Sequence, residues 1–195
     1  MPRYEEMDDM IATSEGRRAV DAATKLYLAG EQLDMSVLAR ELGIGRATLY
    51  RHVGNRDDLI ATVLAEATER TYRKVFADAT GSGAALVLDT LERVMNAVAE
   101  SEPLRILTSR EPALFIRLAL LPGRIESTSA RMVAELLDSE QRQGNLALPL
   151  AADVLGEAIV RICDAHLYAP LLGGDRPRID TALAIVALLL GERRA

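Results

Sequence analysis

The run from Arg46 to His52 carries the side chains with the clearest chemistry in the chain. If it is helical, Leu49 and Val53 lie one turn apart and face inward. The side chains left on the outer surface are Arg46, Ala47, Thr48, Tyr50, Arg51 and His52. Arginines can donate to guanine edges or phosphates, alanine and the threonine methyl can meet a thymine methyl, and tyrosine and histidine can reach phosphate oxygens. These residue types therefore predict contact with double-stranded DNA.

Basic charge is concentrated around this run. Four arginines and one glutamate lie between Ser36 and Arg56, whereas the 195-residue chain has a net charge of −6. Local basic charge on an acidic protein is typical of a protein that touches nucleic acid with one small face. We expect Ser36 and Arg56 to belong to that face. The alternative is a solvated pair of helices that happens to be rich in arginine.

Helix start and stop signals place the run on the second of two short helices. Asp34 is a good N-cap, and Gly43 suits the left-handed position that ends a short helix. Gly45 is a weaker N-cap for the next helix, which Gly54 closes. Asn55 then opens a third helix with two aspartates in its first turn. Two short helices joined by a glycine-containing turn form a helix-turn-helix, whose second helix enters the DNA major groove.

The segment LARELGIGRATLYRHVGNRDDLI resembles the DNA-binding signature of the TetR family of bacterial transcriptional regulators. The matching core is LA, LG, TLY, H, and then R and L. Val53 stands where the family often has Phe, Arg56 where Lys is frequent, and Gly45 where a small polar cap is usual. The resemblance covers about the first third of the chain. It also implies that the start of the preceding helix, about 14–30, approaches the DNA backbone. Arg17 or Arg18 is therefore a candidate phosphate contact, with a solvated charge as the alternative.

Composition predicts an all-α protein. Hydrophobic residues make up 49% of the chain and aromatic residues 4%, with no tryptophan, so the core is mainly aliphatic. One cysteine permits no internal disulfide, which fits a reducing cytoplasm. The first twelve residues hold four carboxylates and no apolar core, so we read them as a frayed arm rather than a secretory signal. The longest apolar run, Ala182 to Leu190, is too short for a membrane span. We expect a soluble, cytoplasmic protein.

The sequence divides into a helix-turn-helix DNA-binding domain, residues 1–55, and a helical ligand-binding and dimerisation domain, residues 56–195. A long helix over 56–80 is the predicted connector, and a Gly-Ser-Gly turn follows it. The last helices, about 151–171 and 178–192, are apolar on more than one face, so each must be buried on more than one side. Burial against a second copy predicts a homodimer with a four-helix interface. The TetR resemblance implies the same interface.

Polar side chains within the second domain are candidate ligand contacts. His166 lies on an apolar helical stripe with Cys163 one turn before it. It either faces an apolar ligand pocket or lies in the core or interface with a hydrogen-bond partner. The full set of candidates is Met95, Phe115, Arg117, Cys163, His166 and Tyr168. One cysteine and two histidines do not make an ordinary soft-metal site, and no cofactor motif or catalytic constellation is present. We therefore expect no metal, no cofactor and no enzyme activity.

The segments REPALFIRLALLPG and RICDAHLYAPLLGG are similar to the C-terminal domains of the QsdR-like group. That group is linked to control of genes that degrade lactone quorum signals, so the resemblance implies an apolar acyl or lactone-like ligand. The leading hypothesis is a dimeric repressor of a palindromic operator, released by such a ligand. The alternatives are a regulator that never responds to a ligand and a small-molecule-binding protein with a vestigial DNA-binding unit.

Overall fold

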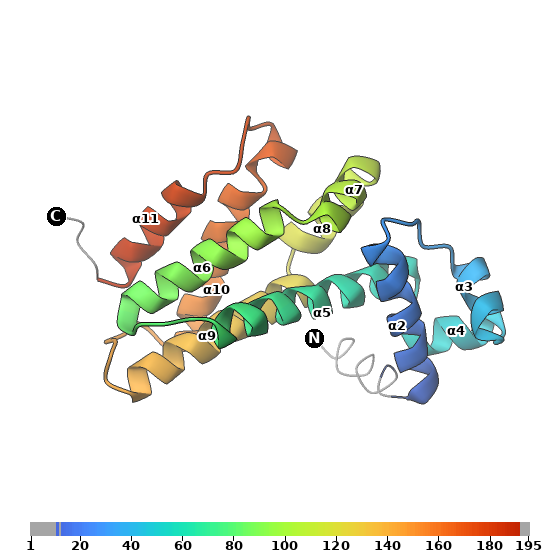
Figure 1. The fold of residues 1–195 in the computed structure, drawn as a ribbon, viewed down its shortest axis with the longest axis horizontal. Helices are drawn as coiled ribbons and strands as arrows, with labels where there is room; N and C mark the ends of the chain where they lie inside the picture. Colours follow the sequence, from blue (N-terminus) through green and yellow to red (C-terminus); the bar gives the residue numbers. More distant parts are fainter. Residues whose placement is uncertain (1–10, 12, 192–195) are drawn as a thin grey trace. The chain divides into compact units, whose positions relative to one another are not determined.

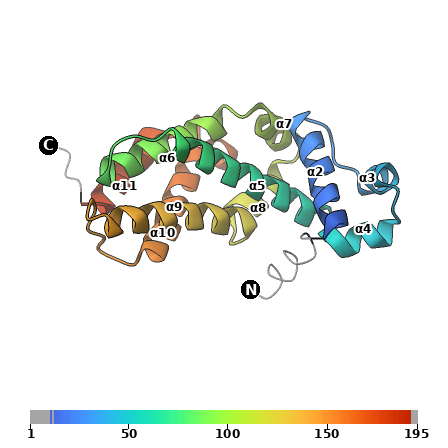
Figure 2. The same cartoon turned by 60° about the horizontal axis from the view of Figure 1, so that its bottom comes forward.

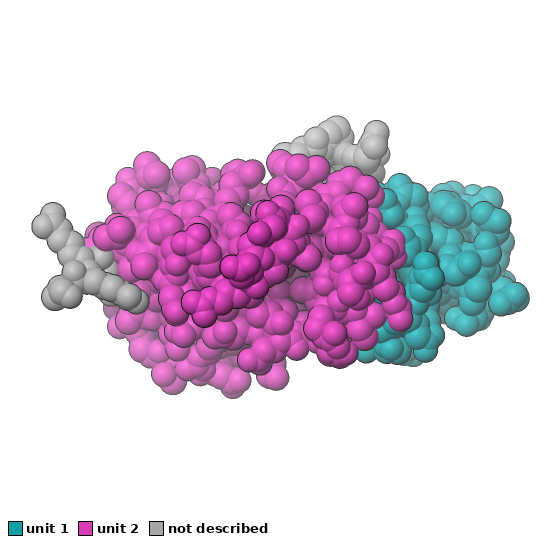
Figure 3. Space-filling model, turned by 90° about the horizontal axis from the view of Figure 1, so that it is seen from above, with its two compact units in different colours: residues 1–66 teal, residues 67–195 magenta. Residues whose placement is uncertain are grey.

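The computed structural model describes residue 11 and residues 13–191, and the predicted N-terminal arm lies outside this range except for Ile11. Every regular element among the described residues is helical, which confirms the all-α prediction (Figure 1). By Cα packing the chain divides into two compact units, residues 1–66 and 67–195 (Figure 3). The sequence predicted a boundary after residue 55, at the start of the long helix α5 (Arg56–Ala77). The division instead falls within that helix.

Among the described residues, the first unit contains three complete helices and the beginning of α5. The helices are α2 (Ser14–Leu28), α3 (Met35–Leu42) and α4 (Arg46–Val53). Fully buried side chains of these helices and of the beginning of α5 form an aliphatic core, which includes Ala19, Val20, Leu38, Leu49, Val53 and Leu59. Burial of such side chains is the main stabilising contribution to so small a unit. The core therefore fixes which face of α4 points inward.

Local capping explains where these short helices begin and end. The Asp34 carboxylate accepts hydrogen bonds from the amides of Ser36, at 2.7 Å, and Val37, at 3.1 Å. These bonds hold the pKa of Asp34 below its usual range. Gly43 ends α3 with φ 69°, the left-handed conformation that glycine adopts without a Cβ penalty. The sequence predicted both caps, because caps depend on neighbours along the chain.

The second unit packs its helices around one apolar core. Its elements are the rest of α5, α6 (Gly83–Ala99), α7 (Glu102–Arg110), α8 (Pro112–Leu120), α9 (Arg124–Arg142), α10 (Ala152–Leu167), the 3-10 helix η1 (Ala169–Leu172) and α11 (Ile179–Leu189). The core includes Leu91 from α6, Met132 and Leu137 from α9, and Leu155 and Ile159 from α10. Helices α9 and α10 pack closely against each other (Figures 1 and 2).

A glycine permits the close approach of α9 and α10. A Cβ atom built on Gly156 would lie 2.7 Å from the carbonyl oxygen of Ala130 and 3.1 Å from the amide nitrogen of Ala134. Both are backbone atoms of α9, so they cannot rotate away. Any side chain at position 156 would therefore force the two helices apart.

A buried carboxylate holds the start of α6. Glu140 of α9 is 4% exposed and accepts a hydrogen bond from the amide of Gly83 at 2.6 Å. Its second contact is the Asn145 side-chain amide, 3.0 Å away. A negative charge at a helix N-terminus satisfies free amides and interacts favourably with the helix dipole. Ser82, the local N-cap, makes no such side-chain bond.

Prolines mark three of the helix boundaries, and at the third of them our prediction was wrong. Pro103 and Pro112 occupy first-turn positions of α7 and α8, as the sequence predicted. The helix predicted over about 151–171 instead ends at Leu167. Pro170 explains this, because its ring removes an amide and clashes with the preceding turn, and the chain continues as η1.

Among the described residues, no helix is both long and apolar enough to cross a membrane.

Candidate nucleic-acid interface

The outer face of α4 presents most of the residues that the sequence selected for DNA contact. Arg46, Ala47 and Arg51 are exposed, Tyr50 is 39% exposed, and Thr48 is partly buried. Ser36 is exposed in the first turn of α3. None of these side chains is needed for the core, since Leu49 and Val53 anchor the opposite face of α4 with no exposed surface. The outer face of α4 therefore presents hydrogen-bond donors and methyl groups, while the inner face is fixed in the core.

A constrained turn connects α4 to α5. Gly54 has φ 70° and ψ −154°, a conformation open essentially only to glycine. A Cβ atom there would lie 2.6 Å from the carboxylate of Asp58. Asp58 itself accepts a hydrogen bond from the Asn55 amide at 2.9 Å, and the Asn55 side chain caps the amides of Asp57 and Asp58. This reciprocal capping fixes the end of α4 relative to the start of α5 within the first unit.

Arg17 lies at the start of α2, but its guanidinium is engaged by carboxylates. It is 3.1 Å from Asp21 and 2.8 Å from Glu66, with 46% of the side chain exposed. The hydrogen bond that Arg17 donates to Glu66 raises the pKa of Arg17. A phosphate contact by Arg17 would require these ion pairs to open or to be shared.

Arg56 is turned toward the protein rather than outward. Its Nε donates to the carbonyl oxygen of Leu33 at 2.9 Å, and its Nη1 lies 3.9 Å from the carboxylate of Asp57. Through these contacts Arg56 ties the start of α5 to the loop before α3. The helical pattern could place Arg56 in the first turn but could not show that the side chain folds back.

His52 is also held within the protein. Its Nε2 is 2.8 Å from the carboxylate of Glu15, its Nδ1 is 3.2 Å from the hydroxyl of Thr13, and the side chain is 16% exposed. Sequence reasoning missed both partners. They lie at the start of α2, far from His52 along the chain, and no local pattern signals such a contact.

In the second unit, two of the six candidate ligand contacts meet each other. Phe115 and Tyr168 pack edge to face with ring centroids 5.0 Å apart. Phe115 is buried, whereas Tyr168 is partly exposed. Met95 is buried in the core, and Arg117 lies on the surface. Met95 and Cys163 belong to the same apolar core, against which Tyr168 packs, whereas Arg117 lies apart from it on the surface.

Cys163 and His166 lie on successive turns of α10 without forming a reactive pair. The Nδ1 atom of His166 is 2.8 Å from the carbonyl oxygen of Ile162, so the ring hydrogen-bonds its own helix. Burial raises the pKa of the Cys163 thiol to about 12. A thiol of that pKa is almost entirely protonated at neutral pH and is a poor nucleophile. Within residues 11 and 13–191, no group of three or more metal-ligating side chains gathers.

A polar cluster that the sequence did not reveal lies between α5, α9 and α10. The Tyr72 hydroxyl shares a hydrogen bond with Ser129, and its burial raises its pKa far above the usual range. Asp164 lies close to both Tyr72 and Cys163. Burial, together with the negative charge of Glu126, raises the pKa of Asp164 to about 7.

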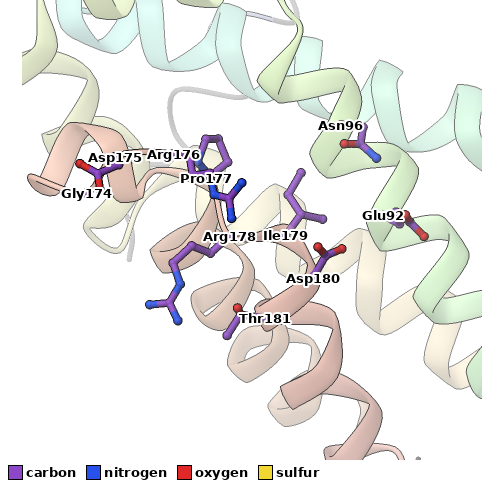
Figure 4. A pocket seen from close by; sticks show the side chains of 10 residues that line it. All are labelled: Glu92, Asn96, Gly174, Asp175, Arg176, Pro177, Arg178, Ile179, Asp180 and Thr181. Atoms are coloured by element: carbon purple, nitrogen blue, oxygen red, sulfur yellow. The ribbon is translucent and has the colours of Figure 1, made fainter.

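Two cavities in the second unit differ in character. A surface cleft of about 630 Å³ lies between α6 and the segment from Gly174 to Thr181. Figure 4 shows Glu92 and Asn96 on one side and Asp180 on the other, with Arg176 and Arg178 on the loop that precedes α11. Its wall thus mixes charges of both signs. A smaller cavity of about 180 Å³ has mainly apolar walls, formed by Val98, Ala99, Leu104, Leu167, Tyr168, Pro170, Leu171 and Pro177, with Ser101, Arg105 and Thr108 beside them.

Comparison with known proteins agrees with this architecture. Residues 82–191 match the family described as tetracyclin repressor-like, C-terminal domain. The structure of the transcriptional repressor QsdR of the TetR family from R. erythropolis is similar at 59% sequence identity, with a TM-score of 0.91, over 93% of this chain and 96% of that one. No curated protein sequence matches.

Two more distant structures share the fold. The TetR family repressor AlkX from a Dietzia species has 18% identity and a TM-score of 0.61, over 92% of this chain and 95% of that one. The fatty acid degradation regulator FadR from Bacillus halodurans has 16% identity and a TM-score of 0.53, over 91% and 95%. The helix-turn-helix, the family match and the QsdR similarity lead to one conclusion. The chain belongs to the TetR family of transcriptional regulators and is a DNA-binding regulator rather than an enzyme.

Proposed function

We propose that the protein is a homodimeric repressor that binds a palindromic operator through the α4 helices of its two subunits. The observation that carries this proposal is the outer face of α4, where Arg46, Ala47, Thr48, Tyr50 and Arg51 surround a helix anchored by Leu49 and Val53. Paired recognition helices read half-sites about one DNA turn apart. The similarity to a TetR family repressor supports repression over activation.

Exposed apolar side chains support dimerisation through α10 and α11. Val154 at the start of α10 is 51% exposed, and Leu188 and Leu189 at the end of α11 are 67% and 36% exposed. Side chains of this size on two neighbouring helices form an apolar surface that a second copy can cover. We therefore place the subunit interface on α10 and α11. Sedimentation at micromolar concentration should give a dimer, and a monomer at that concentration would contradict the assignment.

Replacement of Arg46 by alanine should weaken operator binding by roughly 1–3 kcal/mol, because a base contact from an exposed recognition-helix arginine is lost. The operator is first selected from random double-stranded DNA by the purified protein at near-physiological salt. Affinity is then measured by fluorescence anisotropy on the selected site and on random DNA. The selection should yield a palindrome, and its absence would contradict the proposed function. Equal losses on both DNAs would assign Arg46 to a phosphate instead.

The apolar cavity of about 180 Å³ supports a small, mainly apolar effector. A cavity of this size can hold a single ring with a short chain. Tyr168 lines it and can supply a polar contact, and Phe115 packs behind Tyr168. Together with the resemblance of the C-terminal segments to the QsdR-like group, this supports a short-chain lactone as the effector class. Such a ligand would release DNA only by binding one subunit arrangement more tightly than the other.

Filling the cavity should remove the response to the ligand and leave DNA binding intact. Leu104 lines the cavity, so Leu104→Trp places a large side chain in the space that the ligand needs. With γ-hexalactone as the probe, the parent protein should release operator DNA, and the variant should need at least about tenfold more lactone. Leu121→Trp, at an exposed site outside the cavity, is the matched control. If γ-hexalactone does not release the parent protein from DNA, the proposed effector class is wrong.

A further inference from the structure

A contact between His52, Thr13 and Glu15 joins the end of α4 to the start of α2. His52 lies in the last turn of the recognition helix, and Glu15 lies in the first turn of α2. Both ring nitrogens of His52 have partners in the protein, Glu15 at 2.8 Å and Thr13 at 3.2 Å. With 16% of its side chain exposed, His52 has little surface left to offer a phosphate.

The donors and acceptors of these groups form one continuous chain. The amide of Gly16 donates to the Thr13 hydroxyl at 3.0 Å. That hydroxyl can then donate to Nδ1 of a neutral His52, whose Nε2–H donates to the Glu15 carboxylate. The bond to the carboxylate is charge-assisted and therefore the strongest of the three. Every group in the chain is satisfied, so the arrangement is a defined contact between α2 and the end of α4.

We propose that His52 is a positioning residue, and that Glu15 and Thr13 hold the recognition helix through it at the angle that operator binding requires. The core contacts of Leu49 and Val53 determine which face of α4 points inward, but apolar packing is not directional. Hydrogen bonds are directional, and these act on His52 in the last turn of α4. This role rests on the proposed operator binding, because it concerns the presentation of α4 to a specific site.

The direction in which Glu15→Ala changes operator affinity shows whether Glu15 positions α4 or acts only through its charge. Glu15 is negative, so removing its charge should strengthen binding to DNA if electrostatics alone decides. If Glu15 positions α4 through His52, Glu15→Ala should instead weaken operator binding, by about tenfold, as for loss of a charge-assisted hydrogen bond. Glu41→Ala is the matched control, because Glu41 is an exposed carboxylate of α3 that has no ion pair among the described residues.

The experiment measures operator and random-DNA affinities of the full chain and of Glu15→Ala, His52→Ala, the double variant and Glu41→Ala, at several salt concentrations. We expect both single variants and the double variant to lose the same factor on the operator. Random-DNA affinity should not fall in any of these variants, and Glu41→Ala should not weaken binding to either DNA. His52→Gln, which keeps a donor for Glu15, should recover part of the loss.

Several results would overturn the proposal. One is operator binding by Glu15→Ala that equals or exceeds that of the parent. Additive losses in the double variant would also contradict it, because independent groups add and coupled groups do not. A loss in His52→Ala that is equal on operator and random DNA, with a salt slope reduced by about one, would make His52 a phosphate contact.

A second measurement does not depend on an operator. Amide hydrogen exchange over residues 50–54 of the free protein should be faster in Glu15→Ala than in the parent, and unchanged in Glu41→Ala, because the end of α4 loses its contact with α2. Unchanged exchange would contradict the positioning role. Failure of the parent protein to select any operator would instead contradict the proposed function, and the two failures are thus distinguishable. Glu15→Gln removes the charge but keeps an acceptor oxygen for His52, so it replaces Glu15→Ala with a smaller expected loss if the latter does not fold.

Discussion

Gly156→Val should destabilise the protein by about 3 kcal/mol, because overpacking a tight helix contact strains backbone that cannot move aside. The new Cβ atom alone would lie 2.7 Å from the carbonyl oxygen of Ala130. The helix preference of valine over glycine offsets only a few tenths of a kcal/mol of this cost. Thermal or urea unfolding measures the loss. Since α10 also carries the proposed subunit interface, sedimentation should show weaker dimerisation in the variant.

Two further substitutions test whether steric contact is the cause. Gly156→Ala introduces the same Cβ atom but gains about 1 kcal/mol of helix propensity, so its net loss should be smaller. Ala165→Val places a valine at an exposed position of the same helix, and its loss should stay below about 1 kcal/mol. A Gly156→Val protein as stable as the parent would mean that α9 and α10 lie further apart than the structure shows.

Asp164→Asn should stabilise the protein, and its advantage should grow between pH 5 and pH 8. The pKa of Asp164 is raised from 3.8 to about 7 in the folded protein, by burial and by Glu126. Between these values the folded state binds a proton that the unfolded state has released, so stability falls as pH rises through this window. Asparagine does not titrate and avoids the loss. Partial exposure of Asp164 limits the growth of the difference to on the order of 2 kcal/mol.

Unfolding free energies at pH 5, 6, 7 and 8 provide the measurement. Asp175→Asn removes a carboxylate from the exposed loop before α11 and serves as the matched control, whose stability should follow that of the parent at each pH. A constant difference between Asp164→Asn and the parent across this range would show that Asp164 is already ionised at pH 5. The polar cluster around Tyr72 would then be more open to water than its burial indicates.

The sequence predicted well those features that neighbouring residues determine. Asp34, Gly43 and Asn55 act as the caps that their residue types indicated, and the inward positions of Leu49 and Val53 follow from helical period. The all-α fold and the family could be predicted for the same reason, because the helix-turn-helix signature is contiguous. These features need no knowledge of distant parts of the chain.

Features that depend on distant residues could not be predicted. The amide of Gly83 is capped by the carboxylate of Glu140, and the ring of His52 contacts the carboxylate of Glu15. Both partners are far away along the chain. Arg56 shows the same limit, because the helical pattern placed it beside the DNA-facing residues while its guanidinium binds the carbonyl of Leu33. Period and residue type identify which positions are polar, but only the folded chain determines which partner each polar group finds.

The state of the single cysteine has a practical consequence for measuring subunit geometry. Cys163 is 6% exposed and has a pKa of about 12, so maleimide and methanethiosulfonate reagents should leave it unlabelled in the native protein near pH 7. A cysteine introduced at an exposed position of α4 would then be the only labelled site of each subunit. Spin labels at that site would report the distance between the two recognition helices in a dimer, with and without an effector. The protein can thus be studied in this way without replacing any native residue in its core.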